Sequence, residues 1–168
     1  MVTKKVEKLL NEQINKELFS AYLYLDMANF YADKNLDGFA NWFTVQAKEE
    51  VSHAQIFMDY MKEIGVKIVL EAIDKPQIEF KDLKAPLVEA LKHEEYVTAS
   101  IHNLMEAAIE EKDYRTKMIL DWFVKEQIEE EANADELINH FDMIGSKGIY
   151  MMNKDLLTRV FVEPDFTI

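Results

Sequence analysis

The chain has 168 residues, 49% of them hydrophobic, and a formal net charge of −13 at pH 7. That length suits one domain with a substantial core, and the scarcity of glycine and proline, with four and three residues, favours helix over sheet. The absence of cysteine excludes disulfides, zinc fingers and thiolate iron–sulfur sites, and the acidic charge argues against a nucleic-acid partner.

Two long helices are predicted in the first third of the chain. In residues 6–31 the residues of one face recur at alternating steps of four and three, which is the spacing of a helix seam. Thr3 suits the N-cap of this helix, and Asp37 suits the N-cap of the next. The same spacing continues over residues 39–64, and Gly65 fits a left-handed C-terminal cap.

An extended connection is predicted next. Residues 66–84 lose the helical period and contain Pro76, which disfavours a helix there. About 20 extended residues can reach roughly 60 Å, whereas a helix of about 28 residues is only roughly 40 Å long. The connection can therefore run the whole length of the molecule before Pro86 starts a third helix.

The end of the chain predicts a fourth long helix and a short fifth one. Asp113 is expected to cap the fourth helix, and Gly145 and Gly148 are expected to stop it. The short helix is expected to begin at Asn153, as its cap, and to end near Phe161.

These elements predict an all-α fold. Two short turns and one long crossover between the second and third helices specify a four-helix bundle, with the short fifth helix at the C-terminus. We find no linker or repeat, so residues 1–168 are expected to form a single domain. The sequence also lacks the apolar run of a signal peptide and the roughly 18 uncharged apolar residues of a membrane span. We therefore expect a cytoplasmic protein without a membrane partner.

Each long helix carries polar residues in the middle of its seam. Because mid-helix positions lie at similar depth whichever way a helix runs, these side chains should converge in one buried layer. They are Gln13, Glu17 and Ser20, then Gln46, Glu50 and His53, then Glu94 and Thr98, and finally Gln127 and Glu130.

Such a layer needs positive charge. Ionised carboxylates in a dry interior cost several kcal/mol each unless they are neutralised, and no lysine or arginine occupies the predicted seam. Protonated carboxyls or bound cations remain, and two divalent ions would relieve both repulsion and desolvation. Glu50 and His53, three residues apart, lie on one helix face and can hold one ion together. Many carboxylates with one imidazole suit Fe(II), with Mn(II) and Zn(II) as competitors.

Four segments closely resemble the prokaryotic non-haem ferritins, members of the ferritin-like di-iron carboxylate proteins, and the resemblance covers the whole chain. They read NKELFSAYLY, KEEVSHA, KHEEY and WFVKEQIEEEA. The resemblance implies that Glu17 is a ligand of the first iron site, and that the segment KEEVSHA supplies the bridging glutamate, Glu50, and the histidine ligand, His53. It implies that Glu94 is a second-site ligand. On the fourth helix, Gln127 matches a glutamine near the site and Glu130 matches a further second-site carboxylate.

The resemblance also implies a third iron site beside the pair. The matching residues are Glu49, Glu126, Glu129 and Glu130. Without the family match, the first three of these read as a solvated acidic face beside the seam. Tyr24 matches a tyrosine that holds the second-site glutamate by a hydrogen bond, although a plain core tyrosine is an equal alternative. Tyr24 and Gln127 are thus the residues expected to take part in the reaction beside the ligands.

Departures from related families refine this expectation. Bacterioferritins and rubrerythrins carry a second Glu-x-x-His motif on the fourth helix. At the matching positions this chain has Gln-x-x-Glu, from Gln127 to Glu130, and this difference favours a site that releases iron over one that keeps it. Val51 replaces the methionine that ligates haem in bacterioferritin, so haem is not expected. His93, His102 and His140 fall off the seam and are expected at the surface.

The function that the resemblance implies is iron storage and detoxification. A ferroxidase would oxidise Fe(II) to Fe(III) with O2 or H2O2 at a di-iron site within each subunit, and ferric mineral would accumulate in a homo-oligomeric cage of 24 subunits. Two alternatives are a signalling bundle of the helical cytokine type and a soluble di-iron oxidase or peroxidase acting as a monomer or dimer. A signalling bundle needs apolar residues in the middle of each seam, where this chain has polar ones. A monomeric or dimeric oxidase would be a small particle, so a measurement of particle size tests that alternative.

Overall fold

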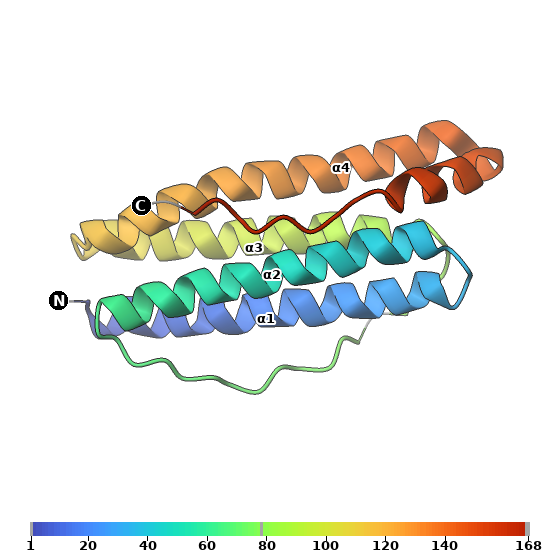
Figure 1. Ribbon diagram of the computed structural model, residues 1–168. Helices are drawn as coiled ribbons and strands as arrows, with labels where there is room; N and C mark the ends of the chain where they lie inside the picture. Colours follow the sequence, from blue (N-terminus) through green and yellow to red (C-terminus); the bar gives the residue numbers. More distant parts are fainter. Residues whose placement is uncertain (1, 78, 167–168) are drawn as a thin grey trace.

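The computed structural model describes residues 2–77 and 79–166, and its helices lie side by side as a bundle (Figure 1). Residue 78 of the crossover and the ends of the expected domain lie outside the described residues. The helices are α1 (Lys4–Ala32), α2 (Asp37–Glu63), α3 (Ala85–Glu110) and α4 (Tyr114–Leu156). Short turns make α1 and α2 antiparallel, and likewise α3 and α4, whereas α2 and α3 point the same way (Figure 1). The predicted all-α bundle is confirmed.

The crossover between α2 and α3 is extended and follows α1 along its length (Figure 1). Two asparagines, one helical turn apart on α1, hold it there. The Asn11 Oδ1 atom accepts a hydrogen bond from the Val69 amide at 2.6 Å, and Asn15 Nδ2 donates to the Ala72 carbonyl at 3.1 Å. These bonds satisfy backbone groups that have no helix or strand of their own.

Most of the predicted helix ends are confirmed. Thr3 and Asp113 each accept a hydrogen bond from the backbone amide three residues later, at 3.4 and 3.3 Å. Pro86 lies in the first turn of α3, where its missing N–H costs no helical bond. Gly65 follows α2 with a φ of 71°.

The start of α2 is capped from another part of the chain, and the expected Asp37 cap is wrong. Asp37 is the first helical residue, and Leu36 in the cap position supplies no side-chain bond. Asn153 Oδ1 instead accepts from the amides of Gly38 at 2.8 Å and Phe39 at 3.3 Å. A Cβ on Gly38 would lie 1.6 Å from the Asn153 carbonyl oxygen, so only glycine allows this close crossing.

The fifth helix is present, but its predicted bounds are wrong. At Gly145, with φ 55° and ψ −173°, the chain leaves the helical conformation, turns back and becomes helical again as far as Leu156. Asn153 therefore lies inside this short helix and does not cap it. Of the two glycines expected to stop the fourth helix, only Gly145 breaks the helical conformation, and Gly148 lies within the short helix. Residues 159–166, where the helix was expected to end near Phe161, form no helix or strand and run back along the bundle (Figure 1).

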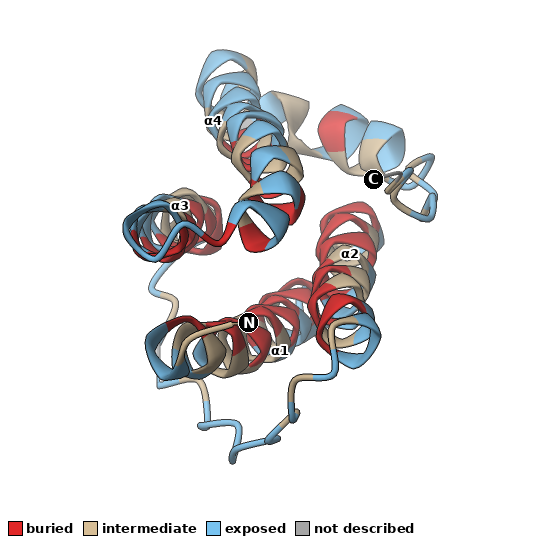
Figure 2. Ribbon diagram, turned by 90° about the vertical axis from the view of Figure 1, so that its left-hand side faces the viewer, coloured by how far each residue is buried: buried red, intermediate tan, exposed pale blue. Residues whose placement is uncertain are grey.

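The buried faces of the four helices point toward the bundle axis (Figure 2). Two apolar clusters fill the interior, one at each end. The first includes Leu10, Phe57, Ile101 and Phe123, and the second includes Met27, Phe43, Leu87 and Leu137. Each such side chain stabilises the fold by about 1.5–3 kcal/mol. None of the helices that the structure describes combines the length and apolar composition that a membrane crossing requires.

Candidate metal centre

Polar side chains are buried between the two apolar clusters. Nine of the predicted mid-seam residues are at most 5% exposed: Gln13, Glu17, Ser20, Gln46, Glu50, His53, Glu94, Gln127 and Glu130. The tenth, Thr98, is half-buried. All four long helices contribute, so the layer forms only when the whole bundle does.

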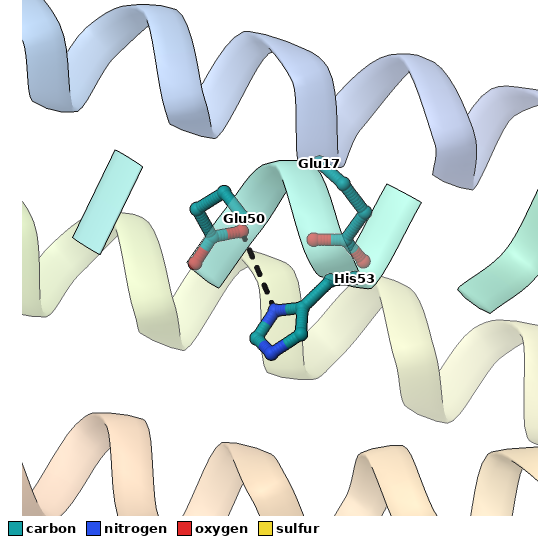
Figure 3. A group of neighbouring side chains, drawn as sticks. All are labelled: Glu17, Glu50 and His53. Atoms are coloured by element: carbon teal, nitrogen blue, oxygen red, sulfur yellow. Dashed lines mark ion pairs between the residues drawn. The ribbon is translucent and has the colours of Figure 1, made fainter. Parts of the chain in front are cut away.

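Glu17, Glu50 and His53 form the first group that could hold a cation. One ligand atom from each lies within 4.8 Å of the others, and Figure 3 shows the three side chains close together. The Nδ1 atom of His53 is 3.7 Å from Glu50 Oε2, too far for a hydrogen bond. The spacing leaves the facing lone pairs free for an ion.

Two atoms in this group have no hydrogen-bond partner among the residues that the structure describes, although both are buried. They are Glu17 Oε2 and His53 Nε2. The other Glu17 oxygen accepts from Gln13 Nε2 at 2.8 Å. A buried polar atom without a partner costs about 1–3 kcal/mol, and a bound cation would remove that cost at both atoms.

His53 also belongs to a second group, with Glu126 and Glu130. Their ligand atoms again lie within 4.8 Å of one another, and His53 Nε2 is 3.7 Å from Glu126 Oε1. One imidazole therefore lies between two sets of carboxylates. Glu130 accepts a hydrogen bond from Gln46 Nε2 at 2.8 Å, which leaves its remaining lone pairs available.

Glu94 lies in the same layer but is held by neutral donors. The Tyr24 hydroxyl donates to Glu94 Oε1, and Gln127 Nε2 donates to Glu94 Oε2 at 3.2 Å. Gln127 also donates to Thr98 Oγ1 at 3.2 Å. Tyr24 and Gln127 thus fix the orientation of one carboxylate, with no positive charge of their own.

Burial changes the ionisation of the layer. It raises the pKa of Glu94 to about 8, with added repulsion from Glu130, and it raises the pKa of Glu50 well above its usual range, against the attraction of His53. Burial disfavours the charged form of His53, but the carboxylates of Glu126 and Glu50 outweigh it and raise the histidine pKa. Without metal the layer therefore retains protons that a bound cation must displace.

The predicted third-site residues are only partly brought together. Glu126 and Glu130 lie with His53, whereas Glu129 is exposed and belongs to neither cation group among the described residues. Glu49 forms an ion pair with Arg159, at 2.7 Å between Glu49 Oε2 and a guanidinium nitrogen. Burial raises the pKa of Glu49 to about 7, although Arg159 opposes the shift.

Two neighbours of the layer were missed or misplaced from the sequence. The prediction that His93 is a surface residue is wrong: it is 8% exposed and its Nε2 lies 2.7 Å from Ser20 Oγ. Burial lowers its pKa to about 4, so it is neutral. The sequence pattern did not indicate Arg159, because the residues that it contacts, Gln46 and Glu49, are remote along the chain. The only hint was that it is one of two arginines in the chain.

Comparisons with known proteins show the family to which the chain belongs. The family model described as "Ferritin-like domain" matches residues 7–144. The "Bacterial non-heme ferritin" of Staphylococcus aureus (strain MRSA252) is 38% identical over 165 residues, which are 97% of this chain and 99% of that protein. The same-named Staphylococcus epidermidis protein is 37% identical over 97% and 99%.

Solved structures give the same result. An Archaeoglobus fulgidus ferritin engineered to a closed form superposes with a TM-score of 0.94, at 38% identity, over 96% of this chain and all of that one. A structure described as a humanized archaeal ferritin gives 0.93 at 40% identity, over 96% and 100% of the two chains.

Proposed function

This chain belongs to the ferritin family, and from that premise we propose that it oxidises Fe(II) in its mid-bundle layer and stores the ferric product. The observation that supports this most directly is the cation group of Glu17, Glu50 and His53, in which two buried ligand atoms have no hydrogen-bond partner among the described residues. Its donors are carboxylates and an imidazole, the set that suits a hard divalent ion such as Fe(II).

In this proposal the two iron ions are substrates. Glu17 and His53 hold the first ion, Glu94 and Glu130 hold the second, and Glu50 lies between them. Each Fe(II) gives up one electron. O2 takes both electrons with two protons and leaves as H2O2. If H2O2 is the oxidant, its O–O bond breaks, and two electrons with two protons give two waters.

Residues around the ligands supply orientation and a route to release. The Tyr24 hydroxyl holds one Glu94 oxygen and Gln127 the other, so the second-site carboxylate is positioned before iron arrives. Gln127 is neutral and binds metal weakly. An Fe(III) ion beside Gln127 therefore has fewer negatively charged ligands than it would have in a site with a second Glu-x-x-His motif. That arrangement favours departure of the oxidised ion to a mineral.

Storage requires an enclosed space, and we propose that the chain assembles into a hollow cage of 24 subunits. Exposed apolar residues of α1 and α2 support assembly. Tyr22, Leu25 and Val51 are 44–50% exposed, and Leu25 and Val51 line an apolar groove of about 380 Å³ together with Phe161. Such a face is costly to leave in water.

The test is Fe(II) oxidation in three proteins: the unchanged chain, Glu50→Ala and His53→Ala. We expect the rapid phase, followed by absorbance of the ferric product after oxygen is added, to fall at least tenfold in both variants. Glu63→Ala, a change of the same kind near the end of the same helix, is the control and should keep the unchanged rate. Equal rates in all proteins would place the chemistry elsewhere.

A further inference from the structure

Arg159 brings a positive charge to the edge of the metal layer. One guanidinium nitrogen donates to Glu49 Oε2 at 2.7 Å and to the side-chain oxygen of Gln46. Gln46 in turn donates to Glu130 Oε2 at 2.8 Å. A single side chain from the C-terminal segment is thus connected to two of the four carboxylates expected at the third iron site.

The segment that carries Arg159 is fixed to α2. Asn41 Nδ2 donates to the carbonyls of Leu156 at 3.1 Å and Arg159 at 2.9 Å. The other guanidinium nitrogen donates to the Trp42 carbonyl at 3.3 Å, and the guanidinium carbon lies 4.6 Å from the centre of the Trp42 ring. The charge is therefore held in place by several contacts, as well as by its attraction to Glu49.

A guanidinium differs from other cationic groups because it keeps its charge at any pH a protein survives. It cannot yield its position by losing a proton. A metal ion that binds Glu49 through Oε2 must displace the guanidinium and break its contact with that atom. An ion at the other Glu49 oxygen meets the repulsion of the fixed positive charge beside it. The pair of sites at Glu17 and Glu94 has no such competitor among the described residues, because no lysine or arginine contacts either carboxylate there.

We propose that Arg159 competes with a metal ion for Glu49, so that the third site stays weak while the two inner sites bind tightly. The inference builds on the proposed function and names a residue that sets the order in which sites fill. Its consequence is a staging site, where an ion remains only briefly before moving on.

A different role for the same contact makes the opposite prediction. If Arg159 only oriented Glu49 for metal, its removal would weaken the third site. Competition requires that removal strengthen it, so the direction of the change decides between the two roles.

The experiment is a Zn(II) titration of the assembled, metal-free protein by calorimetry, because zinc binds the same donors without redox chemistry. The unchanged protein should bind two ions tightly and a third weakly. Arg159→Gln should bind the third about tenfold more tightly, which corresponds to about 1.4 kcal/mol, with the first two unchanged. Arg115→Gln removes the same charge at an exposed position and should match the unchanged protein.

Two further variants locate the effect and guard against misfolding. Arg159→Lys keeps the charge and should leave the third ion weak, and adding Glu49→Gln to Arg159→Gln should abolish the tight third ion. A third affinity that is unchanged or weaker in correctly assembled Arg159→Gln would overturn the inference and leave the proposed function standing. If the unchanged protein does not bind two ions tightly, the result counts against the proposed function instead. The affinity of the ion that depends on Glu49 would still decide the role of Arg159.

Discussion

Glu94 illustrates what the metal-free layer costs the protein. Burial raises its pKa to about 8, so the folded protein keeps a proton that the unfolded chain, with an ordinary pKa of 4.5, has lost. Stability must therefore fall as pH rises from about 5 to 8. We predict that Glu94→Gln, which stays neutral, is more stable than the unchanged protein at pH 8, by about 1–3 kcal/mol.

The measurement is thermal unfolding of metal-free protein at pH 5 and pH 8. The two proteins should differ little at the lower pH and clearly at the higher. Glu95→Gln, at an exposed neighbouring position, should show no such gain. A Glu94→Gln protein that is destabilised at pH 8 would show that the carboxylate is ionised and stabilising without metal.

Tyr24 provides a second prediction at this scale. Its hydroxyl bonds to Glu94 and lowers the carboxyl pKa, against the larger effect of burial. Tyr24→Phe should raise that pKa further, so metal must displace a more tightly held proton. We expect Zn(II) affinity at pH 7 to fall by about tenfold, and to recover partly at higher pH.

The control for this change is Tyr31→Phe. Tyr31 is equally buried in the same helix, but its hydroxyl donates to the Leu83 carbonyl at 2.6 Å, away from the layer. Equal losses of affinity in both variants would mean that the effect comes from packing.

Individual residues of the site differ in how well the sequence predicts them. Glu17, Glu50 and His53 were found because helical spacing puts them on seams that are otherwise apolar, where a charged side chain is conspicuous. His93 was misplaced because it lies one position from Glu94 at the edge of a wide buried face. Arg159 was missed because no periodicity connects an irregular segment to a helix more than 100 residues away.

At the scale of elements, the C-terminal helix is joined to α2 through Asn153. Its side chain satisfies two amides at the start of α2 that no local residue caps. We predict that Asn153→Ala costs about 1 kcal/mol, which lowers the melting temperature by roughly 2–4 °C for a chain of this size. Asn139→Ala, at an exposed site within α4, is the matched control and should have little effect. Equal melting temperatures for both variants would show that the cap is dispensable.

The same asparagine explains why the fifth helix was predicted in the wrong place. Asparagine is a good N-cap, and in the sequence it stands just before a helical stretch. In the structure it does cap a helix, but that helix is α2. The short helix in fact follows Gly145, whose φ is positive. Residue propensity alone could not favour Gly145 over Asn153 as the boundary, because both residue types suit a helix boundary.

At the scale of the whole molecule, the apolar groove between α1 and α2 bears on assembly. If copies of the chain pack on this face, a carboxylate introduced at Leu25 must be taken out of water on a lining in which Lys48 is the one charged residue among those described. We predict that Leu25→Glu yields particles much smaller than the unchanged assembly, as measured by sedimentation velocity. Val160→Glu, at an exposed apolar residue outside the groove lining, should assemble normally. An intact assembly in Leu25→Glu would move the interface elsewhere, and a small unchanged particle would favour a di-iron oxidase over a storage protein.

The bundle itself was predictable because its specification is distributed over the whole chain. Seam spacing, two short turns and a crossover long enough to span the molecule each restrict the topology, and they agree. The surroundings of Glu49 were less predictable, since its ion pair with Arg159 depends on where the C-terminal segment lies after the turn at Gly145. That placement rests on a few contacts between distant residues.

The most direct test of the central claim is anomalous diffraction from crystals soaked anaerobically in Fe(II). We predict two iron peaks per chain inside the bundle, one beside Glu17 and His53 and one beside Glu94 and Glu130, with Glu50 between them. An interior without iron, with ions only on exposed carboxylates, would contradict the account.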